Sequence, residues 1–273
     1  MRRQILDLLR CPRCRQGRLQ AESDAPELVF GPLRCPECQA SYPVAEGVAD
    51  LVADRGAASA FQRGLEQPLI ARSYERYVRP AIQMAIARRR FDRDSEFLLY
   101  RSLLGRPEGP VLDLGSGTGL FARRLARDPE LAAVVGMDVS KAMLEEAVAQ
   151  SREAGVPVDF VRAEAPFLPF QDQTLGAVLQ SGSLHLIEDV SRLFLEVGRV
   201  LRPGGRFVAS TYLPPGRVGT LLHRRAGLHP RGEDELRSAI AAAGLVGFER
   251  MMLPPFILVK AERAQPERSA ALH

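Results

Sequence analysis

The stretch VLDLGSGTGLF, residues 111–121, places three glycines at alternate positions directly after a short apolar run. An apolar run that ends in glycines and continues into a helical pattern predicts a buried strand, a tight turn and a helix start. Glycine is required wherever a ligand approaches the backbone so closely that a Cβ would collide with it. The free N–H groups of the helix start suit a carboxylate or phosphate. By itself, the motif also fits a simple tight turn.

The surrounding pattern supports a layered α/β fold. From 109 to 263, short apolar runs alternate with helical ones, which predicts a mostly parallel sheet with helices on both faces. The last two strand-like runs, near 245–252 and 256–262, have no helix between them, so we expect an antiparallel hairpin at the sheet edge. Residues 213–232, rich in Pro, Gly and Arg, predict a long basic loop. This loop fits a lid over a substrate and a run of solvated arginines equally well.

Composition divides the whole chain into four parts. Residues before the α/β region include a Cys-rich segment and then two or three amphipathic helices, which we expect to break near Pro68 and Pro80. The predicted parts are a ribbon at 1–54, a helical linker or cap at 55–108, the α/β domain at 109–263 and a flexible tail at 264–273.

Charge and hydropathy exclude some classes of protein. The net charge is +4, but only two of the 37 basic residues are lysines, and residues 1–60 carry eight basic and eight acidic side chains. The N-terminal segment is therefore a poor candidate for a basic nucleic-acid surface. No apolar run reaches the ~18 residues that a membrane span needs, and the chain start lacks a secretory pattern. We expect a cytoplasmic protein; its oligomeric state is not predicted.

An acidic residue follows the next predicted strand. Asp138 ends the run VVGMD, 21 residues beyond Gly117, where a carboxylate can accept both hydroxyls of a ribose. The alternative is that Asp138 belongs to the start of the following helix, although Ser140 is already in place to cap that helix. A dinucleotide-binding loop would read GxGxxG, whereas this one reads GSGTG.

These stretches together resemble the class I S-adenosylmethionine-dependent methyltransferases. VLDLGSGTGLFARRL is similar to the first motif of that family and VVGMDVSKAMLEEA to the second. The segments VRAEAPFLPFQDQTLGAVLQSGSLHLIED and EVGRVLRPGGRFVAST agree in order and spacing with later motifs. The resemblance covers about 109–263. It implies a Rossmann-like fold with a seven-stranded, mostly parallel sheet, and S-adenosylmethionine as the cofactor.

The resemblance also implies roles for individual residues. The glycine loop would line the amino acid portion of the cofactor, Asp138 the ribose, and Glu164 with the Ala165 N–H the adenine. Glu164 stands where the family usually has Asp, so its arm is one methylene longer. Gln180 and Ser181 would lie near the transferring methyl, although a structural role fits Gln180 equally well. The candidate cofactor residues are Tyr74, Asp113, Gly115, Ser116, Gly117, Gly119, Asp138, Val139, Met143, Glu164, Ala165, Gln180 and Ser181.

Two further side chains are candidates near the cofactor. Tyr74 and Tyr77 lie one helical step apart, and we expect them on one face of a linker helix, where Tyr74 could reach the cofactor carboxylate; core packing explains the pair equally well. His185, in GSLHLIED, is the candidate catalytic residue, because a histidine there could accept a proton from a hydroxyl or enol. The alternative for His185 is a structural hydrogen bond to the backbone.

The four cysteines of the chain form two CxxC pairs 20 residues apart. Cys11 with Cys14 and Cys35 with Cys38 can present four thiolates to one tetrahedral ion. A filled shell leaves no site for water, so we expect structural Zn²⁺; redox pairs or disulfides are the alternative.

Residues around the cysteines resemble small zinc ribbons related to methyltransferase activator subunits. A ribbon also precedes the methyltransferase in the ribosomal-RNA guanine-N1 methyltransferases and in the plastoglobule-type methyltransferases with their bacterial relatives. SYERYVRP, SLHLIED and RPGGRFVASTYL match the second group better. We therefore expect methyl transfer to a small-molecule acceptor such as a lipid, quinone or secondary metabolite. The alternatives are an RNA methyltransferase whose ribbon grips RNA, and a non-catalytic cofactor-binding partner protein.

Overall fold

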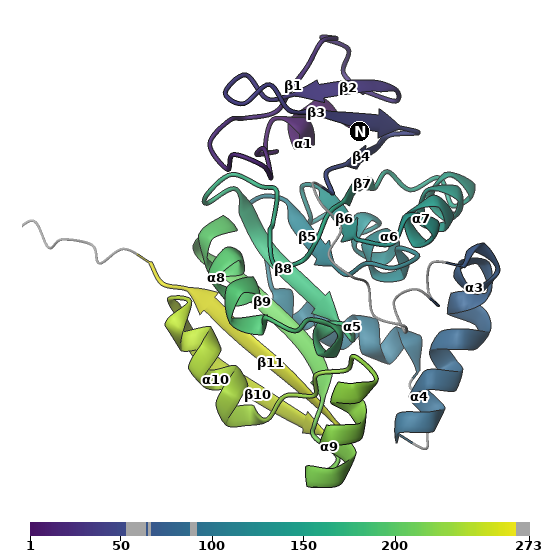
Figure 1. Ribbon diagram of the computed structural model, residues 1–273, viewed down its shortest axis with the longest axis vertical. Coiled ribbons are helices and arrows are strands. Elements are labelled where there is room, and N and C mark those ends of the chain that lie inside the picture. The colour runs from purple at the N-terminus through teal and green to yellow at the C-terminus, as the bar shows by residue number, and fades with distance from the viewer. Residues whose placement is uncertain (53–63, 65–66, 88–91, 266–273) are drawn as a thin grey trace, which may run out of the picture.

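The computed structural model describes residues 1–52, 64, 67–87 and 92–265. The strands within these ranges form one continuous sheet (Figure 1). The strand order is β1-β2-β3-β4-β7-β6-β5-β8-β9-β11-β10. The seven strands from β7 to β10 make up the α/β part of the sheet. They are β5 (Val111–Leu114), β6 (Val134–Asp138), β7 (Asp159–Arg162), β8 (Leu175–Ser181), β9 (Leu201–Tyr212), β10 (Leu245–Leu253) and β11 (Phe256–Arg263).

Strand direction confirms the predicted fold class. Strands β7, β6, β5, β8 and β9 run parallel, while β11 lies antiparallel between β9 and β10. Because both faces of β5 to β8 are covered, their residues are almost all buried, as the continuous apolar runs predicted. The predicted antiparallel edge hairpin is β10–β11.

Helices cover both faces of this sheet. Helices α5 (Arg93–Leu104), α6 (Leu120–Ala126) and α7 (Lys141–Glu153) pack one core cluster. Helices α8 (Val190–Val200) and α10 (Glu233–Ala242) pack the other. The loops that bear the predicted site therefore leave the sheet between two packed layers.

The ribbon is joined to the sheet edge. It consists of α1 (Arg3–Leu6), β1 (Gln20–Ala21), β2 (Gly31–Arg34), β3 (Ser41–Ala45) and β4 (Val48–Asp50). Strand β4 pairs in parallel with β7, so the ribbon strands extend the α/β sheet. The predicted boundary at 54/55 and the start of the predicted linker helices lie outside the described residues, as does most of the predicted tail.

The cap helices differ from the sequence prediction at Pro80. Helix α3 (Pro68–Ser73) begins at Pro68, as expected, but continues through a π-helical turn, η1 (Tyr74–Val78), into α4 (Arg79–Ala87). The predicted break near Pro80 is therefore wrong. A proline in a helix lacks an N–H, and the widened π turn directly before Pro80 accommodates that missing donor without ending the helix.

The predicted basic loop at 213–232 contains a helix, α9 (Gly216–Arg225), so the prediction of an irregular loop is wrong. Pro214 and Pro215 precede the helix and Gly227, at a left-handed φ of 76°, follows its C-cap. These residues are start and stop signals that the sequence interpretation attributed to a loop.

Candidate active site

The C-terminal ends of the central parallel strands open into a cavity of about 750 Å³ between the sheet, the cap helices and the region after α9. This is the edge at which open α/β sheets bind ligands. Most of the residues predicted from the sequence line this cavity. They are Tyr74, Asp113, Gly115, Ser116, Gly117, Asp138, Val139, Met143, Glu164, Ala165, Ser181 and His185. The lining does not include Gly119 or Gln180.

The three glycines of the loop all have left-handed φ angles, but they meet different surroundings. A Cβ on Gly115 would lie 2.2 Å from the Ser183 Oγ, and one on Gly119 would lie 3.1 Å from the Phe160 ring. A Cβ on Gly117 would meet no protein atom within 4 Å. Gly117 is thus the position where the backbone itself faces the cavity, while the other two glycines make room for protein side chains.

The Asp138 carboxylate is tied to the glycine loop. Its Oδ2 accepts the Gly117 N–H at 2.8 Å and its Oδ1 accepts the Ser140 N–H at 2.9 Å. Burial raises the pKa of Asp138, while these two hydrogen bonds act against that rise. Ser140 caps α7 by accepting the Met143 N–H, so the helix does not depend on Asp138 for its cap. Each carboxylate oxygen keeps a lone pair for a ligand hydroxyl.

Asp113, at the end of β5, is a buried carboxylate with an unsatisfied oxygen. Its side chain lines the cavity, the residue is 2% exposed and its Oδ2 has no partner among the described residues. Burial raises its pKa to about 7. Because a buried polar oxygen without a partner is costly, this site fits a ligand that brings N–H donors or positive charge.

The cap supplies a residue that the sequence interpretation missed. Glu75, in the π turn, accepts the Thr118 hydroxyl at 2.6 Å and an Arg123 N–H at 2.8 Å. It thereby joins the cap to the glycine loop. Tyr74 lines the cavity beside it, and burial raises the pKa of Tyr74. Tyr77 is 60% exposed, so the expectation that both tyrosines share one face is wrong; the π turn changes the helical spacing.

The two predicted residues at the end of β8 have protein partners. Gln180 is fully buried and its Nε2 donates to the Ser183 Oγ at 2.8 Å, behind the cavity wall. Ser181 lines the cavity and donates to the Tyr100 hydroxyl at 3.2 Å. Gln180 thus contacts the loop that shapes the cavity, whereas Ser181 borders the cavity itself.

His185 lies in the 3-10 helix η2 (Leu184–Leu186) and lines the cavity. Its ring packs 4.6 Å from that of Tyr212, and its Nδ1 has no partner among the described residues. Burial lowers the pKa of His185 to about 4, with a smaller contribution from the charge of His223. The ring is therefore neutral at pH 7 and can accept a proton or hydrogen bond from a ligand.

The basic segment after β9 divides between the cavity and the fold. Arg224 and His229 line the cavity. Arg231 instead pairs with Glu235 at 2.6 Å and donates to the backbone of Glu188, so it holds the chain in place. Sequence spacing alone did not separate these arginines.

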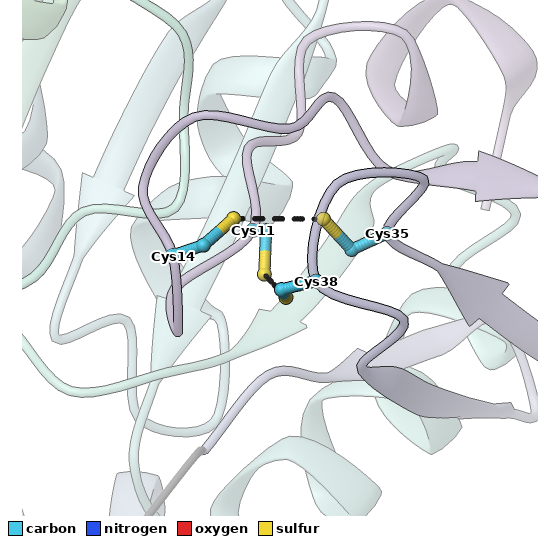
Figure 2. Close-up of side chains that lie close together, drawn as sticks. All are labelled: Cys11, Cys14, Cys35 and Cys38. Carbon is cyan, nitrogen blue, oxygen red and sulfur yellow. Dashed lines mark hydrogen bonds between the residues drawn. The ribbon is translucent and has the colours of Figure 1, made fainter.

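The four cysteines form one cluster in the ribbon (Figure 2). Their sulfur atoms all lie within 4.8 Å of one another, with 3.6 Å between Cys11 and Cys38 and between Cys14 and Cys35. A tetrahedral ion with metal–sulfur bonds of about 2.3 Å separates its sulfurs by about 3.8 Å. The cluster is compatible with such a metal ion.

None of the helices in the described ranges is long and apolar enough to cross a membrane. The cytoplasmic location stays a prediction.

The sheet has one antiparallel strand inserted near its edge, and a glycine loop and an acidic residue end its first two α/β strands. This is the arrangement that the resemblance to the class I S-adenosylmethionine-dependent methyltransferases implied. Family models agree. The methyltransferase domain family matches residues 112–209, and the Trm112p-like protein family matches residues 2–47.

Individual relatives point the same way. An uncharacterized chloroplastic methyltransferase of Arabidopsis thaliana is 32% identical over 57% of this chain and 48% of its own length. The ubiquinone/menaquinone biosynthesis C-methyltransferase UbiE of Desulfotalea psychrophila is 43% identical over 40% of this chain and 44% of its own length. The crystal structure of YcgJ from Bacillus subtilis superposes with a TM-score of 0.57 at 21% identity, covering 63% of this chain and all of that one.

The chain spans about half the length of these two curated relatives. The chain carries a methyltransferase domain and a Trm112-like ribbon in one polypeptide, which supports the predicted resemblance over these two regions.

Proposed function

We propose that this chain transfers a methyl group from S-adenosylmethionine to a small-molecule acceptor. The observation that carries the proposal is the cavity, whose single lining includes the glycine loop and Asp138 as well as His185 and Arg224. Cofactor and acceptor would therefore meet in one enclosed space. Its volume of about 750 Å³ is within the range of small-molecule sites.

The residues present fit the cofactor. Asp113 offers an unsatisfied oxygen for the amino group, and the Gly117 backbone faces the cavity without a side chain. Asp138 would accept the ribose hydroxyls; Glu164 and the Ala165 N–H would contact the adenine. Val139, Met143, Ser116 and Tyr74 would complete the contact surface, as the family resemblance implies.

The chemistry requires positioning more than acid or base strength. S-adenosylmethionine, when bound, supplies an electrophilic methyl group on a sulfonium centre. The chain's own contribution is to hold the accepting atom in line with that group and to keep water out. His185 is the candidate to receive the acceptor's proton, because its ring lines the cavity and its Nδ1 has no partner among the described residues. Gln180, bonded to Ser183, would keep the neighbouring loop in place.

The acceptor class is argued from the cavity and the relatives. UbiE is named for ubiquinone and menaquinone biosynthesis and is 43% identical over 40% of this chain. An apolar acceptor of that kind fits a site that is buried between cap and sheet.

We further propose that the cysteine cluster binds Zn²⁺ in a structural role. Four thiolates fill a tetrahedral shell and leave no open position for water or substrate. The ion would link the two loops that carry the cysteines, and so stabilise the ribbon.

The test is incubation with tritium-labelled S-adenosylmethionine, once with an organic extract and once with total RNA, both from cells that lack this gene. We expect label in the extract only, and none with the Asp138→Ala variant. Nuclease-sensitive label in RNA would overturn the small-molecule acceptor and favour the RNA alternative. Silence in both, with cofactor binding shown by calorimetry, would favour the non-catalytic alternative.

A further inference from the structure

Helix α9 is an amphipathic helix whose apolar side faces away from the protein. It buries none of its ten residues. Val218, Leu221 and Leu222 are 75%, 54% and 57% exposed. At i, i+3 and i+4, these three side chains form one stripe, the pattern by which a helix normally packs on a core. The stripe therefore has no partner within the described part of the chain.

The polar side of α9 faces the protein instead. His223 packs 5.5 Å from the Tyr212 ring and its Nδ1 lies 3.5 Å from the Tyr212 hydroxyl. Arg224 lines the cavity, and so do Gly227 and His229 directly after the helix. Helix α9 thus stands at the border of the cavity with its apolar stripe turned outward.

The charge around the stripe has one sign. Helix α9 carries Arg217, Arg224 and Arg225 and no acidic residue, and residues 207–232 contain no Asp or Glu. Among the described residues, Arg231 forms an ion pair with Glu235, whereas the three arginines of α9 form none. Unpaired arginines beside exposed leucines favour a partner that is anionic and apolar at once.

A second exposed apolar group lies at the same end of the sheet. Met251 and Met252, on β10, are 41% and 37% exposed. The strand register places Leu253 opposite Phe256, and Phe256 opposite Tyr212, two residues before the proline pair that leads into α9. Figure 1 shows α9 and this end of β10 at the same end of the molecule.

We propose that α9, together with the end of the β10–β11 hairpin, is a docking surface for an anionic lipid bilayer. The leucine stripe would enter the boundary between headgroups and acyl chains, and Arg217 and Arg225 would contact the anionic headgroups. Because α9 borders the cavity, docking would bring the cavity next to the bilayer. If the chain is the methyltransferase proposed above, a lipid-soluble acceptor would enter the cavity from this side.

The test is co-sedimentation of the full chain with phosphatidylcholine vesicles and with vesicles of equal parts phosphatidylcholine and phosphatidylglycerol. We expect binding to the anionic vesicles that falls with added salt. The double variant Leu221→Gln/Leu222→Gln should bind at least tenfold more weakly, since it removes most of the stripe. Arg217→Gln/Arg225→Gln should lose the preference for anionic vesicles. Leu195→Gln, equally exposed on α8 at 55%, is the matched control and should bind like the wild type.

Three outcomes would overturn the docking surface: no binding of the wild type at low salt, equal binding by the double leucine variant, or a dimer by light scattering that this variant converts to a monomer. The last result would assign the stripe to contact with a second copy. None of these readouts depends on methyl transfer. Calorimetry with S-adenosylmethionine on the same variants should give wild-type affinity, which separates a failure of docking from a failure of the proposed activity.

Discussion

Buried charged groups have different surroundings in two regions of the molecule, the contact between the ribbon and the α/β sheet and the cavity. At the ribbon, the Asp159 side chain is 3% exposed and both its oxygens accept from Arg2, Oδ1 from the backbone N–H at 2.7 Å and Oδ2 from Nε–H at 2.8 Å. At the cavity, Asp113 is as deeply buried, but its Oδ2 and the Nδ1 of His185 have no partner among the residues that the structure describes.

This difference distinguishes structure from function. A buried ionisable group without a partner destabilises the fold unless something else binds it. Paired charges at the ribbon therefore serve the assembly of the sheet, whereas unsatisfied groups at the cavity indicate a ligand site. Substitutions in the two regions should then have opposite effects on stability.

The largest effect is expected from the cysteine cluster. Cys35→Ser removes one thiolate of the proposed Zn²⁺ site, and we expect it to lose the metal and to lower the free energy of unfolding by on the order of 5–10 kcal/mol, because metal binding and folding of such a ribbon are coupled. Since β4 pairs with β7, the thermal midpoint of the whole chain should fall. Metal content by mass spectrometry and thermal unfolding by circular dichroism measure both. A metal-free variant with an unchanged thermal midpoint would show that the stability of the sheet does not depend on the ribbon, and would contradict this prediction.

The next effect concerns the paired charge at the ribbon. Arg2→Ala removes the guanidinium that pairs with the buried Asp159 carboxylate and leaves it only the backbone N–H of residue 2, at a cost of about 3 kcal/mol. Urea unfolding measures this difference. Arg34→Ala is the control: Arg34 also pairs with an acid, Glu22, but both side chains are more than half exposed, and we expect a change of at most about 0.5 kcal/mol. Equal effects of the two substitutions would contradict the role of burial.

At the cavity, a substitution that removes a buried charge should stabilise the fold instead of destabilising it. Burial raises the folded-state pKa of Asp113 to about 7, so the folded state binds this proton more tightly than the unfolded state between pH 4 and 7. The contribution of Asp113 to stability therefore falls as pH rises through that window. Asp113→Asn removes the buried charge, and we expect it to be about 2–3 kcal/mol more stable than the wild type at pH 8 and nearly equal at pH 4. Urea unfolding at both pH values tests this; a destabilised variant at pH 8 would show that Asp113 serves the fold.

The smallest effect is expected from His185. Burial lowers its folded-state pKa to about 4, so the unfolded state takes up the proton first, and the contribution of His185 to stability decreases as pH falls from about 6.5 towards 4. His185→Asn should remove this loss. The difference in unfolding free energy between the variant and the wild type should therefore be about 1–2 kcal/mol more favourable to the variant at pH 5 than at pH 7. Parallel urea titrations give the difference. A gain that does not change with pH would place the imidazole in water rather than in the cavity wall.

Much of the fold was predictable because local pattern determines it. The alternation of apolar runs and helices predicted the layers, and the missing helix before β11 predicted the antiparallel hairpin. The glycine loop and Asp138 were found from spacing alone, since the ends of neighbouring parallel strands meet at one edge of the sheet. The paired CxxC motifs similarly predicted one cluster of four sulfurs.

What escaped prediction depends on contacts between distant segments. The pairing of β4 with β7 joins residues more than a hundred positions apart, and no local pattern encodes it. Glu75 reaches the glycine loop only because a π turn changes the helical spacing around it. Helix α9 was interpreted as a loop because residues 213–232 are rich in Pro, Gly and Arg, although some of these residues turned out to begin and end a helix.

The central claim is that the cavity at the C-terminal ends of the parallel strands, with its unpaired polar groups, is the cofactor site. Calorimetric titration with S-adenosylmethionine tests this claim most directly. The account predicts one site per chain for the wild type. Arg34→Ala should bind with the same affinity, and Asp138→Ala at least tenfold more weakly, with α7 still capped by Ser140. Equal affinity in all three proteins, or no binding by the wild type, would contradict it.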